Sequence, residues 1–292
     1  MIKIARAAMV AICMCLNISI LGTIFLICTL FKYIMPGSRI RRFFFFCTEQ
    51  LYHLWVDVNS IIYATFLPTK WNFEFDQELS PTTWYAIIAN HSSGVDILAL
   101  QKVFNRKIPH LKFFMKDSLK WVPFVGIICY LSDYPLIKRY NASQIRKNPK
   151  NKLKNVNSLK SACKRLKKNP VTIINFLEGA RFNETRKKLK KSPYKNLLPP
   201  QAAGTSIVLN ELKDEITQVL DVTINYSKGA TLVDFITGNI PEITVKLETI
   251  DLNSSWHGEF YEDKVFRQTI VAKFQNLWQQ KDKLINQMFE QT

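Results

Sequence analysis

Two short segments carry side chains that together could perform acid–base chemistry on an anionic substrate. The first has an imidazole at His91 and a carboxylate at Asp96, and the second has a carboxylate at Glu178, a glycine at Gly179 and a guanidinium at Arg181. An imidazole that a carboxylate holds through one ring nitrogen can take up a proton at the other. A guanidinium presents planar donors that suit a phosphate. We therefore predict a general base, the group that orients it and an anion-binding group.

Both segments follow runs of residues that are typical of buried strands. The run before His91 is 84–89, and the run before Glu178 is 171–177. The carboxyl ends of parallel strands meet at one edge of a sheet, where ligands and catalytic groups commonly lie. We therefore expect the two segments to emerge at the same edge.

A helix is expected to begin near Gly94, with Ser92 or Ser93 as its cap. In one continuous helix, residues five positions apart lie about 140° apart around the axis. His91 and Asp96 therefore need the turn between them in order to meet.

Strand-like runs alternate with helical patterns along the rest of the chain. Further strands are predicted at 111–115, 216–226 and 243–250, and helices at 158–168 and 204–212. This alternation predicts an α/β fold with a mostly parallel mixed sheet flanked by helices.

Two segments outside this alternation also carry predictions. Apolar residues recur at helical spacing from Phe266 to Met288, which predicts an amphipathic helix packed on the sheet. The Lys- and Asn-rich stretch 146–157 is predicted to be a mobile loop.

The amino-terminal segment is long and apolar enough to cross a membrane. Residues 7–31 contain no charge and would span about 37 Å as a helix, more than the roughly 30 Å hydrocarbon core of a bilayer. A cleaved signal peptide is the alternative, but the apolar run is longer than a typical signal core and no convincing small-residue cleavage site follows it. We predict a membrane anchor at residues 1–69 and a catalytic domain at 70–292.

A second apolar stretch, at residues 43–67, contains polar side chains and is not expected to cross the membrane. It is predicted to be an interfacial or re-entrant helix, with an ordinary buried helix as the alternative. More Lys and Arg follow the first span than precede it. The positive-inside rule therefore places the catalytic domain on the cytoplasmic side.

Basic residues are concentrated in one part of the chain. Between Lys138 and Lys195 there are 19 Lys and Arg against two Glu, so this segment carries a net charge of +17, equal to that of the whole chain. Such a surface behind an anchor indicates anionic lipid headgroups, with a solvated loop face as the alternative. No nucleic-acid-binding motif is present, so no nucleic-acid partner is expected. The six cysteines have no C-x-x-C spacing and predict neither a disulfide framework nor a metal site.

The two reactive segments form a recognisable pattern. Asn-His-x-Ser-x-x-Asp at 90–96, followed by Phe-x-Glu-Gly-x-Arg at 176–181, resembles the glycerolipid acyltransferases, best known as lysophosphatidic acid acyltransferases. Two further blocks match in order, one at 116–126 that runs on to Lys138 and Arg139, and one at 198–200 with a glycine after it. The resemblance covers roughly residues 85–204.

The resemblance implies a role for each matching residue. His91 would act as general base on the hydroxyl of the acceptor, and Asp96 would orient it. Residues at the matching positions would bind the acceptor phosphate: Lys116, Lys138, Arg139 and Arg181. Others would shape the site: Asn90, Ser93, Glu178, Gly179 and Pro199. Backbone N–H groups after His91 are expected to stabilise the oxyanion.

The resemblance also implies the partners of the reaction. No metal and no cofactor is expected, and the acyl donor would be acyl-CoA or acyl-carrier protein. The leading prediction is transfer of a fatty acyl chain to the sn-2 hydroxyl of lysophosphatidic acid or a related lysophospholipid, which would yield phosphatidic acid. The alternatives are a catalytically silent lipid-binding protein of the same fold and an acyltransferase for another lysophospholipid.

The chain departs from the usual pattern at two positions of the third block. Leu177 stands where proline is common, and Ala180 where threonine is common. A lost threonine hydroxyl removes one possible hydrogen bond, worth about 1 kcal/mol. The reaction type is therefore better defined than the acceptor. Lys, Asn and Ile richness and the short amino-terminal flank indicate a bacterial inner membrane.

Overall fold

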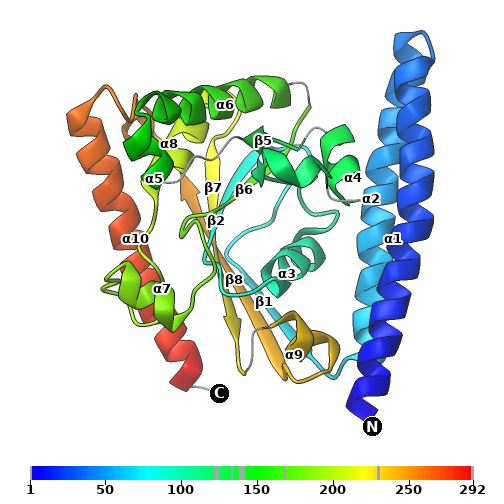
Figure 1. Ribbon diagram of the computed structural model, residues 1–292. Helices are drawn as coiled ribbons and strands as arrows, with labels where there is room; N and C mark the ends of the chain where they lie inside the picture. Colours follow the sequence, from blue (N-terminus) through cyan, green and yellow to red (C-terminus); the bar gives the residue numbers. More distant parts are fainter. Residues whose placement is uncertain are drawn as a thin grey trace.

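The computed structural model describes residues 2–121, 125–132, 134–137, 142–167, 169–228 and 231–290, and it places helices on both sides of a central sheet (Figure 1). The helices are α1 (Ile2–Ile34), α2 (Ser38–Phe66), α3 (Val95–Phe104), α4 (Val125–Leu131), α5 (Ala142–Lys147), α6 (Lys150–Leu166), α7 (Glu184–Leu189), α8 (Ala202–Glu211), α9 (Leu232–Ile236) and α10 (Lys264–Glu290). Short 3₁₀ helices lie at Asp117–Trp121 and Ser254–Trp256.

The strands form a six-stranded sheet and a separate two-stranded one. They are β1 (Lys70–Phe75), β2 (Tyr85–Ala89), β3 (Leu111–Phe113), β4 (Met115–Lys116), β5 (Leu136–Ile137), β6 (Thr172–Phe176), β7 (Gln218–Tyr226) and β8 (Glu242–Asp251). The order in the large sheet is β1-β8-β7-β2-β6-β3, and β4 pairs with β5. Within the large sheet only the β7–β8 pair is antiparallel. The predicted mostly parallel mixed sheet is therefore confirmed.

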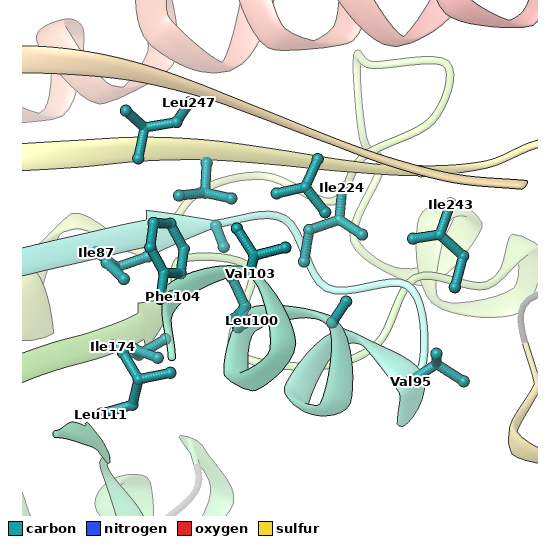
Figure 2. Close-up of a cluster of buried hydrophobic side chains, with 14 of the residues drawn as sticks. Ile87, Val95, Leu100, Val103, Phe104, Leu111, Ile174, Ile224, Ile243 and Leu247 are labelled. Atoms are coloured by element: carbon teal, nitrogen blue, oxygen red, sulfur yellow. The ribbon is translucent and has the colours of Figure 1, made fainter. Parts of the chain in front are cut away.

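Side chains of the central strands alternate between two hydrophobic cores, because successive residues of a strand face opposite sides of the sheet. In β2, Tyr85 and Ile87 pack into the core beneath α3, whereas Ala86 and Ile88 pack into the core beneath α6, α8 and α10. Figure 2 shows the first core, in which residues of α3 lie against the strands. The sheet is thus covered on both faces and holds its carboxyl-terminal loops in fixed positions.

Two predictions about secondary structure were wrong or incomplete. The stretch 146–157, predicted to be a mobile loop, lies almost entirely in α5 and α6. Apolar residues near the end of α6, such as Leu159 and Cys163, pack into the second core and fix the helix there, while its first turns carry exposed charges. Strand β1 was not predicted, since it is an edge strand with exposed polar side chains.

The first two helices form a hairpin at one side of the domain, where α1 packs against α4 and α9 and α2 packs against α3 (Figure 1). Asn17 of α1 donates to the Asn59 side chain at 2.9 Å and to the Trp55 carbonyl at 3.0 Å, and so ties α1 to α2. Val10 is fully buried in the first core. Among the described residues α1 is the one helix long and apolar enough to cross a membrane. Its outward side is apolar and exposed, which suggests membrane association.

The predicted carboxyl-terminal amphipathic helix is α10. Its apolar residues, including Phe274 and Trp278, are buried in the second core. Lys281 is also buried there, and its ammonium group lies 2.7 Å from the Asp221 carboxylate and donates to the Val222 carbonyl at 2.7 Å. The prediction that the stripe packs on the sheet is confirmed.

Candidate active site

The two reactive segments leave adjacent strands at the same edge of the sheet, as predicted. Ala89 at the end of β2 pairs with Phe176 at the end of β6. Beyond the strands, the Leu177 N–H donates to the Ala89 carbonyl at 3.3 Å, and the Phe182 N–H donates to the His91 carbonyl at 2.7 Å. The backbone therefore holds the two loops side by side.

The turn between β2 and α3 brings His91 and Asp96 together. His91 Nδ1 lies 2.8 Å from Asp96 Oδ2. The same carboxylate oxygen accepts the N–H groups of Ser92 at 2.8 Å and Ser93 at 2.9 Å, and the Ser93 hydroxyl accepts the Val95 N–H at 3.0 Å. The carboxylate is fully buried and accepts these donors, so Nδ1 carries the proton that points to it.

The other ring nitrogen of His91, Nε2, has no hydrogen-bond partner among the described residues. The imidazole stacks on Phe176 with ring centroids 4.0 Å apart, which fixes its plane. Its side chain is 14% exposed, so a substrate can reach it. The geometry is that of a general base with an orienting carboxylate.

Tyr226 at the end of β7 is a site residue that the sequence analysis missed. Its hydroxyl donates to the second carboxylate oxygen of Asp96. Burial, and then the negative charge of Asp96, raise the pKa of Tyr226 well above its usual value, so it stays a donor. Asp96 is thus held from β7 and from its own turn. The two residues are 130 positions apart, and no local pattern connects them.

The expected oxyanion role of the backbone after His91 is wrong for Ser92, Ser93 and Val95. The N–H groups of Ser92 and Ser93 both donate to Asp96, and that of Val95 donates to the Ser93 hydroxyl. A backbone N–H already committed inside the protein is not available to a substrate oxygen.

Glu178 is a buried bridge between three of the sequence blocks. Its Oε1 accepts the His91 N–H at 2.8 Å and its Oε2 accepts the Leu198 N–H at 2.8 Å, directly before Pro199. Burial raises the pKa of Glu178 to about 7, although the backbone hydrogen bonds from His91 and Leu198 oppose this shift. Its position fits the predicted shaping role, because it fixes the loop that carries the imidazole.

The remaining predicted residues that the structure describes surround this pair. Gly179 has a φ of 65°, and a Cβ there would lie 2.9 Å from the Gln201 side chain, so glycine fits best. Arg181 is exposed, and a Cβ at Gly94 would lie 3.7 Å from its Nη2, so the guanidinium stands beside the His91 turn. Asn90 is buried and bonds the Ile224 N–H and carbonyl, both at 2.8 Å.

The side chains of three predicted phosphate ligands lie outside the part of the chain that the structure describes. Lys116 belongs to β4 and its backbone pairs with Ile137, but its side chain lies outside the described part of the structure. Lys138 and Arg139 lie outside the described residues altogether.

A cavity of about 530 Å³ opens beside the imidazole. It is walled mainly by apolar and aromatic side chains of the hairpin, α3, α4, β3 and β6. His91, Phe176 and Ala180 lie at one part of its wall, and Phe25 of α1 and Leu51 of α2 at another. The candidate base therefore faces a space suited to an apolar chain.

No group of three or more His, Cys, Asp or Glu that could hold a metal ion occurs within the described ranges. All six cysteines are free. The expected absence of a cofactor stays a prediction.

The chain folds as an α/β sheet covered on both faces, with a His–Asp pair at the edge of the sheet beside a mainly apolar cavity. The chain belongs to the acyltransferase family, whose model matches residues 71–226.

Individual relatives agree with this assignment. The chain is 24% identical over 189 residues to mouse 1-acyl-sn-glycerol-3-phosphate acyltransferase epsilon, covering 57% of this chain and 49% of the relative. It is 26% identical over 178 residues to Arabidopsis thaliana 1-acyl-sn-glycerol-3-phosphate acyltransferase 3, covering 55% of this chain and 44% of the relative. The chain thus spans about half the length of these curated relatives.

A solved structure shows the same fold. The 1-acyl-sn-glycerophosphate acyltransferase PlsC from Thermotoga maritima matches with a TM-score of 0.53 at 15% identity, covering 100% of this chain and 98% of that one. The likeness extends over the whole chain, the amino-terminal hairpin included.

Proposed function

We propose that this protein is a membrane-associated O-acyltransferase that moves a fatty acyl chain from a thioester to the sn-2 hydroxyl of lysophosphatidic acid or a related lysophospholipid. One observation carries the proposal: the His91 ring, held by Asp96 through Nδ1, opens onto an apolar cavity. The names of the mouse and Arabidopsis relatives support the acceptor.

The reaction follows from the free ring nitrogen. His91 Nε2 takes the proton of the acceptor hydroxyl as its oxygen attacks the thioester carbonyl. The buried Asp96 carboxylate, 2.8 Å from Nδ1, stabilises the imidazolium that results. When the tetrahedral intermediate collapses, the carbon–sulfur bond breaks and the departing thiolate takes the proton from the imidazolium. An ester and a free thiol are formed, and the enzyme returns to its first state.

Arg181 is the described residue best placed to bind the acceptor phosphate. Its guanidinium is exposed and stands beside the turn that carries His91, so a phosphate there keeps the neighbouring glycerol hydroxyl near the base. Lys116, Lys138 and Arg139 are proposed as further phosphate ligands. The donor is proposed to be acyl-CoA or acyl-carrier protein.

The α1–α2 hairpin is proposed to hold the enzyme at the membrane, with residues 1–69 as anchor and the catalytic domain on the cytoplasmic side of a bacterial inner membrane. The outward side of α1 is a stripe of exposed apolar residues, among them Ile12, Leu16, Ile20 and Ile27. Protease access to a tag at each end of α1 in sealed vesicles would distinguish a crossing from insertion into one leaflet.

Thiol release by the detergent-purified protein tests the proposal. We expect release from acyl-CoA or acyl-carrier protein only when lysophosphatidic acid is present, and loss of that release in His91→Ala. Absence of release with every lysophospholipid and both donor types would contradict the proposal and favour a silent lipid-binding protein.

A further inference from the structure

The segment that follows the loop of Glu178 forms a strongly basic surface around α7. Residues 181–195, called the α7 surface below, contain seven Lys and Arg against one Glu, a net charge of +6. Lys187 lies 3.8 Å from the Glu184 carboxylate, and no other cation of the α7 surface forms an ion pair within the described structure. The described protein therefore leaves most of this charge without a carboxylate partner, and such a surface attracts anionic partners.

Hydrogen bonds hold the α7 surface against the candidate active site. The Phe182 N–H donates to the His91 carbonyl at 2.7 Å, and the Lys190 ammonium group donates to the Glu178 carbonyl at 2.9 Å. Ala180, which directly precedes the α7 surface, lines the cavity beside the imidazole. A partner bound on the α7 surface therefore lies next to the reacting groups.

Cations of the α7 surface also bond to its own backbone. Arg186 Nη1 donates to the Arg181 carbonyl at 2.8 Å, and the Lys187 ammonium group donates to the Lys195 carbonyl at 2.8 Å. These bonds place charges from both ends of the segment side by side without neutralising them. The exposed cations are Arg181, Arg186, Lys188, Lys191 and Lys195.

One large apolar side chain lies among these charges. Leu189 is 77% exposed, and lysines precede and follow it in the sequence. A protein partner can cover this side chain and pair the cations around it, in the usual arrangement of an apolar centre with a polar rim. The phosphates of CoA can pair the cations only. The combination therefore favours an acidic protein over a nucleotide.

The α7 surface lies away from the proposed membrane anchor. In Figure 1, α7 and α1 are on opposite sides of the central sheet. Attraction of lysine to anionic headgroups falls off within a Debye length, about 8 Å at physiological ionic strength. A soluble anionic partner is therefore favoured over the headgroups beside α1.

We propose that the α7 surface is the docking site of an acidic acyl-carrier protein, so that the enzyme takes its acyl chain from a protein-bound thioester in preference to acyl-CoA. This rests on the proposed function. Carboxylates of the carrier pair with the exposed cations, and an apolar side chain of the carrier covers Leu189. The thioester arm of the carrier then enters the cavity beside Ala180.

Competition between two donors that carry the same saturated acyl chain tests the proposal. Acyl-carrier protein is compared with acyl-CoA, with lysophosphatidic acid as the acceptor. We expect kcat/KM to favour the carrier protein by about tenfold at low ionic strength, and high salt to remove most of this preference, because exposed charges are screened. An equal or higher kcat/KM for acyl-CoA at low ionic strength would overturn the proposal.

A double charge reversal assigns the preference to the α7 surface. Lys188→Glu with Lys191→Glu is expected to lower kcat/KM for the carrier protein about tenfold and to leave that for acyl-CoA near wild type. Lys164→Glu with Lys213→Glu is the matched control, because both lysines are exposed and precede β6 and β7, at the opposite ends of these strands from the site. An equal loss in the control, an equal loss with both donors, or no loss would contradict the assignment.

Leu189→Ser tests whether the partner is a protein. Its side chain is exposed, so the fold is expected to tolerate the change. We expect about a fivefold loss of kcat/KM with the carrier protein and none with acyl-CoA. The same kcat/KM as wild type with the carrier protein would show that no protein partner covers Leu189.

The outcome also separates this inference from the proposed function. Transfer from acyl-CoA alone would overturn the docking site and leave the proposed function in place. If neither donor is transferred, binding of fluorescently labelled acyl-carrier protein decides: tighter binding to wild type than to Lys188→Glu with Lys191→Glu supports the docking site, and equal binding rejects it. A loss of binding to anionic phospholipid vesicles in that variant, with unchanged binding of the carrier protein, would assign the α7 surface to lipid instead.

Discussion

Two histidines that line the cavity, His91 and His110, each contact a carboxylate, but they differ in what surrounds the second ring nitrogen. His91 bonds Asp96 through Nδ1 and leaves Nε2 without a partner in the described structure. His110 bonds Glu49 through Nδ1 and Tyr134 through Nε2, and its side chain is 4% exposed. Burial lowers the pKa of His110 to about 4. The pairing alone therefore does not make a base, because a base also needs a nitrogen that faces the substrate.

The orienting carboxylate gives the largest expected effect after His91 itself. Asp96→Asn leaves the shape of the site but removes the charge that stabilises the imidazolium, and we expect turnover to fall about a thousandfold. Steady-state thiol release with lysophosphatidic acid measures it.

Glu49→Gln is the matched change in the other pair. Glu49 contacts His110 and not His91, so turnover should stay near that of wild type. Equal losses in Asp96→Asn and Glu49→Gln would show that both pairs act only through structure.

Binding of the acceptor phosphate should depend on Arg181. Arg181→Gln removes a charge-assisted bond, so kcat/KM for lysophosphatidic acid is expected to fall on the order of 10- to 100-fold, with little change for monoacylglycerol, which has no phosphate. Kinetics with both acceptors measure the difference. Arg146→Gln, an exposed change on α5, is the control. A similar loss with both acceptors would place Arg181 outside the phosphate site.

Tyr226 distinguishes the His91 pair further, because its hydroxyl donates to the second carboxylate oxygen of Asp96. In Tyr226→Phe the Asp96 carboxylate keeps its bond to His91 but loses the donor to its second oxygen, so the imidazole is held less firmly. We expect about a fivefold loss of kcat for thiol release with little change in KM. Equal changes in kcat and KM, or turnover equal to that of wild type, would contradict this positioning role.

The smallest expected effect concerns stability. Burial raises the pKa of Glu178 from 4.5 to about 7, so the folded protein binds this proton more tightly than the unfolded chain. The resulting stability is fully present below pH 4.5 and is lost as the pH rises toward 7. As the pH rises across this window, the melting temperature should decline less in Glu178→Gln than in wild type.

The contribution of His110 to stability depends on pH in the opposite direction. Its lowered pKa means that stability is present above pH 6.5 and is lost as the pH falls toward 4, a decline that His110→Gln should remove. Identical pH dependence in wild type and both variants would contradict these two environments.

The sequence predicted the parts of the site that lie close together along the chain. His91 and Asp96 share one turn, and Glu178 ends the neighbouring strand, so periodicity and parallel pairing were sufficient to bring them together. Tyr226 was not predictable, because β7 reaches Asp96 only through tertiary packing. The second pair was missed for the same reason, since Glu49 and His110 come from different elements.

The secondary structure also divides into elements that the local sequence predicted and elements that depend on tertiary packing. The buried strands have a distinct apolar pattern and were found, whereas β1 has exposed polar residues and exists because β8 pairs with it. Helix α6 was missed in its first half, where composition favoured a loop and packing further along fixed a helix.

Turnover of His91→Ala and His110→Gln, measured side by side with the same thioester and lysophosphatidic acid, tests the central claim most directly. The account predicts about a thousandfold loss or more in His91→Ala and activity near that of wild type in His110→Gln with a saturated donor. Full turnover in His91→Ala would contradict the assignment of the base, and so would an equal loss in the two variants.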